Sequence, residues 1–530
     1  MASFKRLSLI LLTSCAGAAL TACDGAADIA SPGTGGNVII NNPPAPTPTP
    51  APTPTPAPLV TAATGCPTIA DPQGLVDSGT ITGPTGSYRV CTLPSRINAS
   101  INLPKIAGLA YRLGGRVDVG TDGGPVATAA DTNVTLNIEP GAIIFGGTGV
   151  SWLAVNRGNK INAVGTATAP IIFTSRDNIL GLNTDSSSGQ WGGVVLMGRA
   201  QVTDCAAPAA TPGTVACERQ TEGAVDPALY GGANNADNSG RLSYVQIRFS
   251  GYVLSANVEL QSLTTEGTGT GTQIDHVMSF NSSDDGAEFF GGQVNMKYFI
   301  SVGAEDDNID TDTGLKGKFQ YVIAAQRSGI GDAMIEADTD NALDGNTPRQ
   351  ATFVSNATFV QRSTTGADLA AILLRGGTDY TIANSVLVSP DLACLRISRA
   401  NTIQAADPAQ DELGPPVFRS VVMQCPATKY LGANSVTNAQ VQTIFGSGAN
   451  NNNDSFVPTL VGVYVNGANE TAVTPFNAAT LFPFFDTTTF IGAVKSSAAA
   501  DAWYTGWTCN SATASFGTGN SGNCTSLPTG

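Results

Sequence analysis

The residues best suited to chemistry are acids that repeat in the middle of the chain. Three successive segments contain an acid followed four residues later by another: Asp284 with Glu288, Asp306 with Asp310, and Asp332 with Glu336. The segments recur at intervals of 22 and 26 residues, and Ser255 with Glu259 is a weaker earlier copy. Residues i and i+4 of a β-strand share a face, and paired strands lie about 4.8 Å apart. Stacking of these segments would therefore form two columns of carboxylates.

The negative charge of two columns of carboxylates must be balanced, and we expect calcium to balance it. Residues 284–344 contain 13 acids and 4 bases, and like charges this close are unfavourable unless they are protonated, splayed into water or neutralised. Calcium accepts about six to eight oxygen ligands with tolerant geometry. The expected ligands of a structural calcium site are Asp284, Asp285, Glu288, Asp306, Asp307, Asn308, Asp310, Asp312, Asp332 and Glu336. A solvated acidic face without metal and a purely catalytic acid cluster are the alternatives.

Short runs of β-forming residues must position these acids. Such runs, separated by Gly, Asn, Asp and Pro, occupy 134–138, 142–145, 171–174, 194–197 and 244–247. Runs that recur about every 20 to 30 residues are typical of a solenoid with stacked coils. We predict an all-β fold, a right-handed parallel β-helix with caps at both ends, because right-handed crossovers are the general preference. Its expected parts are an N-terminal cap at 61–130, the parallel β-helix at 131–430, and C-terminal coils and a cap at 431–530.

The first 60 residues predict export and membrane anchorage. Residues 1–22 contain Lys5 and Arg6 followed by an apolar run, as a secretory signal peptide does. Residues 20–23 read LTAC, which resembles the processing site of bacterial lipoproteins and implies a lipid on Cys23. The remainder of 23–60 is mostly a Pro/Thr-rich spacer, which would extend at about 3.1 Å per residue. We expect the lipid to attach the protein to the bacterial outer membrane, facing the cell surface or the periplasm.

The cysteines after residue 60 predict disulfides. They fall as close neighbours in sequence, and the expected pairs are Cys66 with Cys91, Cys205 with Cys217, Cys394 with Cys425, and Cys509 with Cys524. Other connectivities stay open, because eight cysteines can pair in many ways. No pair has the C-x-x-C spacing, which disfavours a redox or zinc role.

Five stretches carry a family resemblance. They are NAVGTATAPIIFTS (162–175), GQWGGVVLMGRA (189–200), NSSDDGAEFFGG (281–292), EDDNIDTDTGLKGKFQY (305–321) and FIGAVKSSAAADAWYTGWT (490–508). Together they resemble a broad, largely uncharacterised family of bacterial secreted or lipid-anchored right-handed parallel β-helix proteins. The resemblance implies the fold and an extracytoplasmic setting but no substrate or catalytic residues. A looser architectural similarity links the chain to pectate lyases and polygalacturonases, which also stack Asp residues on a parallel β-helix.

Composition narrows the possible functions. The chain has 26 basic and 41 acidic residues, a formal charge of −15, which argues against nucleic acid as a partner. Its single histidine, His276, disfavours a Ser-His-Asp triad and a multi-histidine zinc site. Trp503, Tyr504 and Trp507 could form either a platform for sugar rings or a packed cap, and the cap is preferred because the end of a solenoid must be covered.

Two classes of function stay open. The first is a surface lipoprotein that binds an extracellular ligand, a glycan or an outer-membrane receptor, on a calcium-stabilised β-helix. The second is a calcium-dependent polysaccharide lyase or a glycosidase that acts on acidic glycans. A lyase needs a base beside the metal, for which Lys316, Lys318 and Arg327 are available, whereas a glycosidase needs two carboxylates.

Overall fold

The computed structural model describes residues 59–222, 224, 226–255, 258–339 and 343–529. The predicted signal peptide, Cys23 and all but the last two residues of the predicted anchor and spacer segment lie outside these ranges. None of the helices within these ranges is long and apolar enough to cross a membrane.

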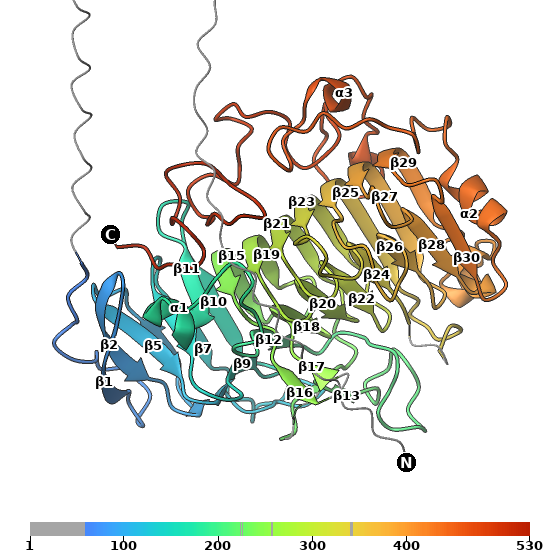
Figure 1. Cartoon of the computed structure of the whole chain (residues 1–530). Coiled ribbons are helices and arrows are strands. Elements are labelled where there is room, and N and C mark those ends of the chain that lie inside the picture. The colour runs from blue at the N-terminus through green and yellow to red at the C-terminus, as the bar shows by residue number, and fades with distance from the viewer. Residues whose placement is uncertain (1–58, 223, 225, 256–257, 340–342, 530) are drawn as a thin grey trace, which may run out of the picture. The chain divides into compact units, whose positions relative to one another are not determined.

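Two sheets run through successive coils of the chain, and their strands are parallel apart from β1, which pairs antiparallel with β2 (Figure 1). Sheet A contains β1 (Val76–Gly83), β2 (Gly86–Thr92), β5 (Leu109–Leu113), β8 (Ile143–Gly146), β11 (Ile171–Ser175), β15 (Gly240–Arg248), β19 (Gln273–Phe280), β21 (Asn295–Val302), β23 (Lys318–Ala325), β25 (Ala351–Val360), β27 (Asp379–Val388) and β29 (Val417–Gln424), with β4 (Ile101–Leu103), β7 (Thr135–Ile138) and β10 (Lys160–Val164) joined to it. Sheet B contains β3 (Arg96–Ile97), β6 (Arg116–Val119), β9 (Trp152–Val155), β12 (Val194–Met197), β18 (Leu263–Glu266), β20 (Ala287–Phe290), β22 (Asp310–Asp312), β24 (Ile335–Ala337), β26 (Ile372–Leu374), β28 (Leu395–Ser398) and β30 (Tyr430–Ala433). The prediction of an all-β parallel β-helix is confirmed.

The coil repeat places acids and their apolar neighbours in register. Glu288 pairs with Asp310, and Asp310 pairs with Glu336. The residues immediately before them, Ala287, Ile309 and Ile335, are fully buried in the main hydrophobic core. Because inward apolar residues of successive coils stack on one another, their burial is the main favourable contribution to the fold.

Sheet A bends along one corner of the coils. From β15 onward, each long strand of sheet A has two parts. The first part of β15 pairs with β10 and its second part pairs with β11, and the later strands pair with β15 and with one another in the same two parts. The residue between the two parts has a positive φ of 48–63°; these residues are Tyr244, His276, Tyr298, Tyr321, Asn356, Asn384 and Ser420. A positive φ is strained for such side chains. Their alignment also stacks the first four rings, with centroids 4.2, 4.3 and 4.9 Å apart.

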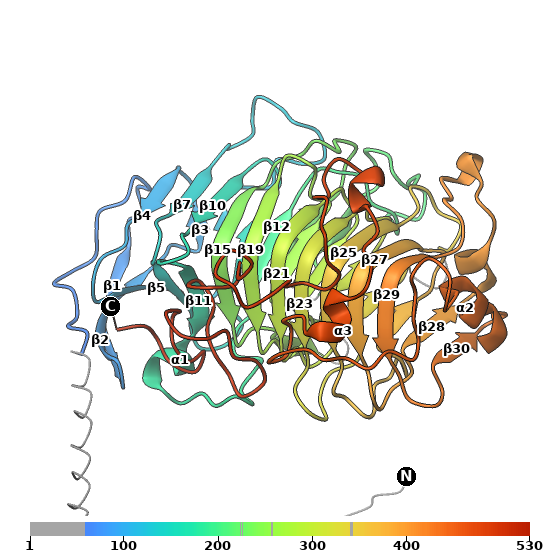
Figure 2. The same ribbon diagram turned by 90° about the horizontal axis from the view of Figure 1, so that it is seen from above.

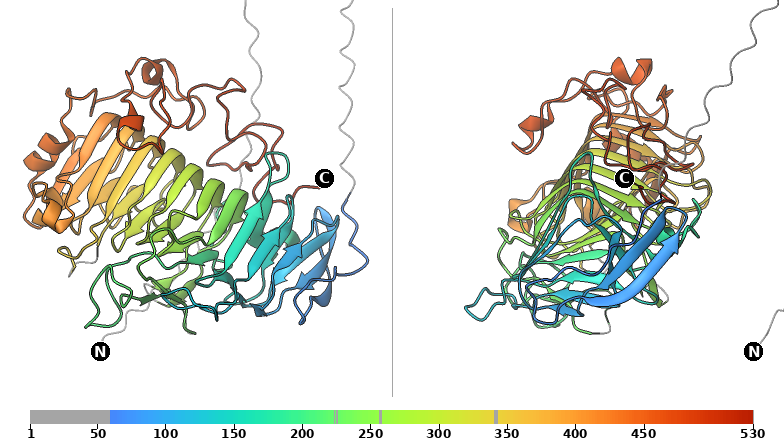
Figure 3. Two further views of the ribbon diagram at one scale, coloured as in Figure 1. Left: turned by 180° about the vertical axis from the view of Figure 1, so that it is seen from behind. Right: turned by 90° about the vertical axis from the view of Figure 1, so that its left-hand side faces the viewer.

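The end of the chain covers this corner. After β30, the segment from residue 446 returns along sheet A from β29 towards β11 (Figures 1 and 2). The Phe476 amide donates to the Asn384 carboxamide at 2.6 Å, and the Asp486 amide donates to the Gln320 carboxamide at 2.9 Å. Near the chain end, the Arg248 guanidinium donates to a carbonyl of this segment, that of Ser526, at 2.9 Å. Figure 3 shows the same segment from behind and end-on.

The remaining elements are short. The helices are α1 (Arg176–Leu180), α2 (Asn438–Phe445) and α3 (Ala468–Thr471), with 3₁₀ turns at Ala400–Ile403, Pro408–Gln410 and Ala478–Thr480. Two antiparallel hairpins, β13 (Arg219–Gln220) with β14 (Leu229–Tyr230) and β16 (Val253–Ser255) with β17 (Val258–Glu259), lie in connections next to sheet B. Helix α2 packs on the last coil, where the Phe445 ring lies 5.3 Å from that of Phe418.

The caps differ from the predicted boundaries. Segment 61–130, expected to be an N-terminal cap, already contains parallel strands of both sheets, from β2 paired with β5 to β3 paired with β6. In the part of the chain that the structure describes, β30 is the last strand of sheet B, so the coils expected after residue 431 are replaced by α2 and the returning segment. Short polar strands such as β3 carry too little β pattern to be found from sequence.

The predicted disulfide pairing is confirmed. Bonds join Cys66 to Cys91, Cys205 to Cys217, Cys394 to Cys425, and Cys509 to Cys524. Each closes a short loop, with sequence separations between 12 and 31 residues. The last bond lies in the returning segment and fixes it beside Met278 of sheet A.

Trp507 anchors the returning segment, and its removal should destabilise the protein. The indole is fully buried, meets the Tyr244 and His276 rings edge-on at 6.1 and 5.6 Å, and donates to the Trp503 carbonyl. A fully buried ring cannot stack on a sugar, so it acts as a packed cover. We expect Trp507→Ala to lower the free energy of unfolding by about 3–5 kcal/mol, measured by denaturant unfolding. An unchanged midpoint would contradict this role.

Candidate functional site

Five of the ten predicted metal ligands line one cavity, here called the acidic cavity. It has a volume of about 270 Å³ and is lined by Glu222, Glu259, Gln261, Asp284, Asp285, Glu288, Asp306 and Asp310. It lies where β20 and β22 begin on the outer side of sheet B. Among the described residues that line it, seven are carboxylates and none is a lysine or arginine.

The tight turn before β20 brings two of these acids together. Asp284 and Asp285 precede Gly286, where an added Cβ would lie 2.1 Å from the Ser301 hydroxyl oxygen. Only glycine therefore allows this turn to approach the next coil so closely. The Asp285 carboxylate accepts a hydrogen bond from the Asp307 amide at 2.9 Å, which links the turn to the next coil.

The opposite wall comes from connections between coils. Gln261, between β17 and β18, donates to the Asp284 carboxylate at 3.2 Å, and the Thr264 hydroxyl donates to the Gln261 carboxamide at 2.6 Å. Glu259 belongs to β17, and Glu222 lies between β13 and β14. Among the described residues of this lining, Gln261 is the one without a carboxyl group.

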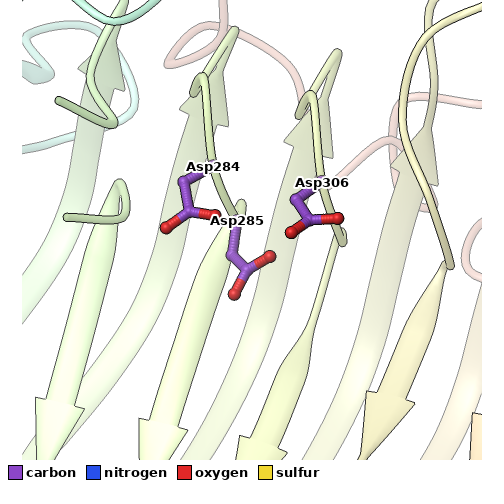
Figure 4. Close-up of side chains that lie close together, drawn as sticks. All are labelled: Asp284, Asp285 and Asp306. Carbon is purple, nitrogen blue, oxygen red and sulfur yellow. The ribbon is translucent and has the colours of Figure 1, made fainter. Parts of the chain in front are cut away.

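The carboxylate oxygens are close enough to share a cation. One oxygen each of Asp284, Asp285 and Asp306 lie within 4.8 Å of one another, and the three side chains surround a common space (Figure 4). Oxygens of Asp285, Glu288 and Asp310 form a second such group. Two oxygens on opposite sides of one calcium ion are about 4.6–5.2 Å apart, so these groups match the reach of one calcium each, with Asp285 common to both.

Burial and mutual repulsion oppose ionisation of these groups. Burial raises the pKa of Asp285, Glu288 and Asp310 well above the ordinary carboxyl value, and neighbouring carboxylates raise it further. The same causes raise the pKa of Asp284 strongly and that of Asp306 to about 6. Without a cation, several of these carboxyl groups must stay protonated near neutral pH.

In the next coils, the protein itself neutralises the stacked carboxylates. Oxygens of Asp307, Glu336 and Asp368 form a third group within 4.8 Å. Here the Arg375 guanidinium forms an ion pair with Glu336, lies 2.7 Å from an Asp338 oxygen, and is 4.0 Å from Asp368. The strand register explains these contacts, because Arg375 follows β26 at the position that Asp338 occupies one coil earlier and Asp312 two coils earlier. The acidic cavity has no such cation among its described lining residues.

The predicted calcium ligands lie in different places in the structure. Asp284, Asp285, Glu288, Asp306 and Asp310 line the acidic cavity. Asp307 and Glu336 belong to the neighbouring group that Arg375 neutralises.

Three predicted ligands lie elsewhere. Asp332 uses both carboxylate oxygens to accept the Ala367 and Asp368 amides, at 2.7 and 2.9 Å. Asn308 is fully buried and donates to the Ser301 hydroxyl. Asp312 lies beyond the cavity on β22. Asn308 does not share a strand face with Asp310, because β22 begins only at Asp310 and the residues before it form a bend.

The proposed bases do not line the acidic cavity. The Lys316 ammonium forms an ion pair with Asp411 at 2.6 Å. The Lys318 ammonium lies 4.5 Å from the centre of the Phe482 ring. Arg327 forms an ion pair with Glu305. These three bases are close to the acids in the sequence, but none of them is among the described residues that line the acidic cavity.

Glu222 and Gln261 line the acidic cavity but were absent from the prediction. Glu222 is 62 residues from Asp284 and lies in a long connection without coil periodicity. The one available signal for Gln261 was its position two residues after Glu259 and three before Thr264. Neither position has a spacing that distinguishes a cavity-lining residue from an ordinary polar residue.

The raised pKa values predict an unusual pH dependence. Between pH 5 and 7, carboxyl groups of the unfolded chain are already ionised, since their pKa values are about 4, whereas Asp306 and its neighbours still bind protons in the folded protein. Folding therefore takes up protons, and the free energy of unfolding should fall as the pH rises from 5 to 7 in the presence of a chelator. Denaturant titrations at each pH measure this slope.

Asp306→Asn provides the matched control for this slope. Because the variant lacks one of the groups with a raised pKa, its unfolding free energy should fall less over the same pH range. A wild-type stability that is flat or rises from pH 5 to 7 would contradict the argument.

Comparison with known proteins identifies the family. No curated protein and no solved structure matches the chain significantly. Residues 124–508 match the model of the pectate-lyase-like β-helix domain family. The match covers most of the described coils, the acidic cavity and the greater part of the returning segment. The chain is therefore a member of the pectate-lyase-like β-helix domain family.

Proposed function

We propose that this protein is an exported, lipid-anchored calcium-binding β-helix that binds an acidic extracellular glycan at the acidic cavity. The observation that carries the proposal is the presence of seven carboxylates, without a lysine or arginine, among the described residues that line one small cavity. Calcium is the cation best suited to so many oxygen ligands at variable distances.

Calcium would supply the charge that Arg375 supplies in the neighbouring coils. At an effective dielectric constant of about 20, two like charges 4 Å apart repel by about 4 kcal/mol. A divalent cation replaces these repulsions with attractions and allows the carboxyl groups to lose their protons. Binding should therefore also stabilise the coils that carry the ligands.

The same cation would explain how an acidic glycan can approach. Without a cation, the negative charge that remains on the ionised lining carboxylates repels a uronate carboxylate. Calcium in the cavity could accept the glycan carboxylate as a further oxygen ligand. The predicted signal peptide, Cys23 and Pro/Thr-rich spacer support a location where such glycans occur, on the bacterial outer membrane and exposed to the cell surface or the periplasm. An outer-membrane receptor is the other ligand that fits this location.

Two aspartates from the same ladder separate calcium binding from general stability. Asp306 lines the acidic cavity, whereas the Asp332 carboxylate is held by two backbone amides of the next coil. We expect Asp306→Asn to weaken calcium binding about tenfold, because the charge of the ligand set determines calcium affinity. Isothermal titration with calcium chloride measures the dissociation constant.

Asp332→Asn is the control for this experiment. It should lower the melting temperature and change the calcium dissociation constant much less than Asp306→Asn does, because the Asp332 carboxylate acts on Asp306 only through its charge. Wild-type protein whose melting temperature does not rise with calcium would contradict the proposal, since calcium at about 100 times its dissociation constant should stabilise by about 2.7 kcal/mol.

Cleavage of acidic polysaccharides is the second candidate function, and family membership favours it. The three bases considered for a lyase are engaged with Asp411, Phe482 and Glu305, which favours carboxylates as the reacting groups. A protonated carboxyl beside an ionised one is the pair that glycoside hydrolysis requires. The raised pKa values in the acidic cavity are compatible with such a pair.

Incubation with acidic polysaccharides and calcium distinguishes the two functions. Binding without chemistry predicts calcium-dependent retention of the protein on polygalacturonate and no new reducing ends. New reducing ends alone would indicate hydrolysis, and reducing ends together with unsaturated uronates would indicate a lyase. Retention that persists unchanged in a chelator would contradict the role of calcium.

A further inference from the structure

One long connection builds part of the acidic cavity from outside the coils. Residues 198–239 link β12 to β15, whereas the equivalent connection one coil later covers only residues 267–272. The long connection packs against the outer face of sheet B through Val202, Cys217, Ala228 and Tyr230, which form one cluster with Phe290. It contains the disulfide between Cys205 and Cys217 and also supplies Glu222 to the acidic cavity.

Glu222 cannot be held in place by its own hairpin. It lies between β13 and β14, which pair through two residues each. A hairpin of this length is not stable in isolation. The position of the Glu222 carboxylate therefore depends on the contacts that fix the hairpin to the rest of the protein.

Besides the ion pair of Arg219 with Asp204 and the hydrogen bonds from Arg116 to the Asp226 and Pro227 carbonyls, three contacts fix the described part of the hairpin. The first is the disulfide, whose Cys217 is fully buried two residues before β13. The second is a hydrogen bond of 2.6 Å from the Thr221 hydroxyl to the buried Glu266 carboxyl group. The third is the contact of the Tyr230 and Phe290 rings at 6.3 Å.

The disulfide also closes the base of the connection. The Ala206 amide donates to the Glu218 carbonyl at 2.9 Å, directly beside the bond. At the entrance to the connection, the Thr203 amide donates to the Thr313 carbonyl at 2.9 Å, which ties it to the coil of β22. The bond thus joins a point fixed on the coil of β22 to the strand that precedes Glu222.

We infer that the bond between Cys205 and Cys217 positions Glu222 and thereby increases the calcium affinity of the acidic cavity. The inference rests on the proposed function, because it concerns the same cavity. The two cysteines are positioning residues, since they act on the cation only through Glu222. Without the bond, the hairpin would hold Glu222 at the cavity for a smaller fraction of the time, and the cavity would lose part of the negative charge that attracts calcium.

A double-mutant cycle tests this inference on the full-length protein. The variants are Glu222→Gln, the double substitution Cys205→Ser with Cys217→Ser, and all three substitutions together. Calcium chloride is the probe, and isothermal titration gives each dissociation constant. Groups that orient a metal ligand contribute about 10-fold to 100-fold in affinity, so Glu222→Gln and the double cysteine substitution should each weaken binding about tenfold.

The triple variant shows whether the bond between Cys205 and Cys217 acts on calcium through Glu222 or only stabilises the fold. If the bond acts through Glu222, the triple variant binds calcium as Glu222→Gln does, without further loss. Cysteine substitutions that leave the dissociation constant unchanged, or whose effect adds in full to that of Glu222→Gln, would overturn the inference. Wild-type protein that binds no calcium would instead refute the proposed function itself.

The bond between Cys509 and Cys524 provides the matched control. Its sequence separation of 15 residues is close to the 12 residues between Cys205 and Cys217, and it lies in the returning segment beside sheet A. Its removal should lower the melting temperature and leave calcium affinity unchanged. If the Cys205 and Cys217 variant does not fold, Thr221→Val tests the same dependence by removing the hydrogen bond to Glu266. Unchanged calcium affinity in Thr221→Val would then overturn the inference.

Discussion

The spacing of about 4.8 Å between paired strands is the constraint on which the rest of the structure depends. Parallel pairing places each side chain against the side chain at the same position of the next coil. Along the corner of sheet A this stacks the Tyr244, His276 and Tyr298 rings, and inside the coils it packs apolar residues. On the outer side of sheet B the same spacing brings Glu288 and Asp310 together, so the interaction that stabilises the core creates repulsion at the acidic cavity.

The protein balances this repulsion in some coils and not in others. Arg375 contacts the acids of the later coils, and the described lining of the acidic cavity has no equivalent cation. Buried charge without a partner is costly, and sequences depart from local stability mainly at functional sites. A bound cation and its ligand would therefore complete a ladder that the chain itself leaves incomplete. Connections outside the coils, with Glu222 and Gln261, enclose the same region.

Much of the fold could be predicted because coil length is visible in the sequence. Intervals of 22 and 26 residues between acids placed Glu288, Asp310 and Glu336 in register, and the disulfides joined near neighbours. The exact ligand set could not be predicted, because it depends on where β22 begins and on which carboxylates bind backbone amides, as Asp332 does. Glu222 was not found because its connection follows no repeat. The returning segment after β30 has no periodic pattern that would distinguish it from further coils.

The most direct test of this account is a crystal structure of the protein grown with calcium, with anomalous scattering recorded to locate the ion. We predict an anomalous peak between Asp284, Asp285 and Asp306, or between Asp285, Glu288 and Asp310, with oxygen ligands at about 2.3–2.6 Å. Absence of a peak at saturating calcium, with the carboxyl groups hydrogen-bonded to one another or to water, would contradict it and leave the acidic cavity as a cluster of protonated acids.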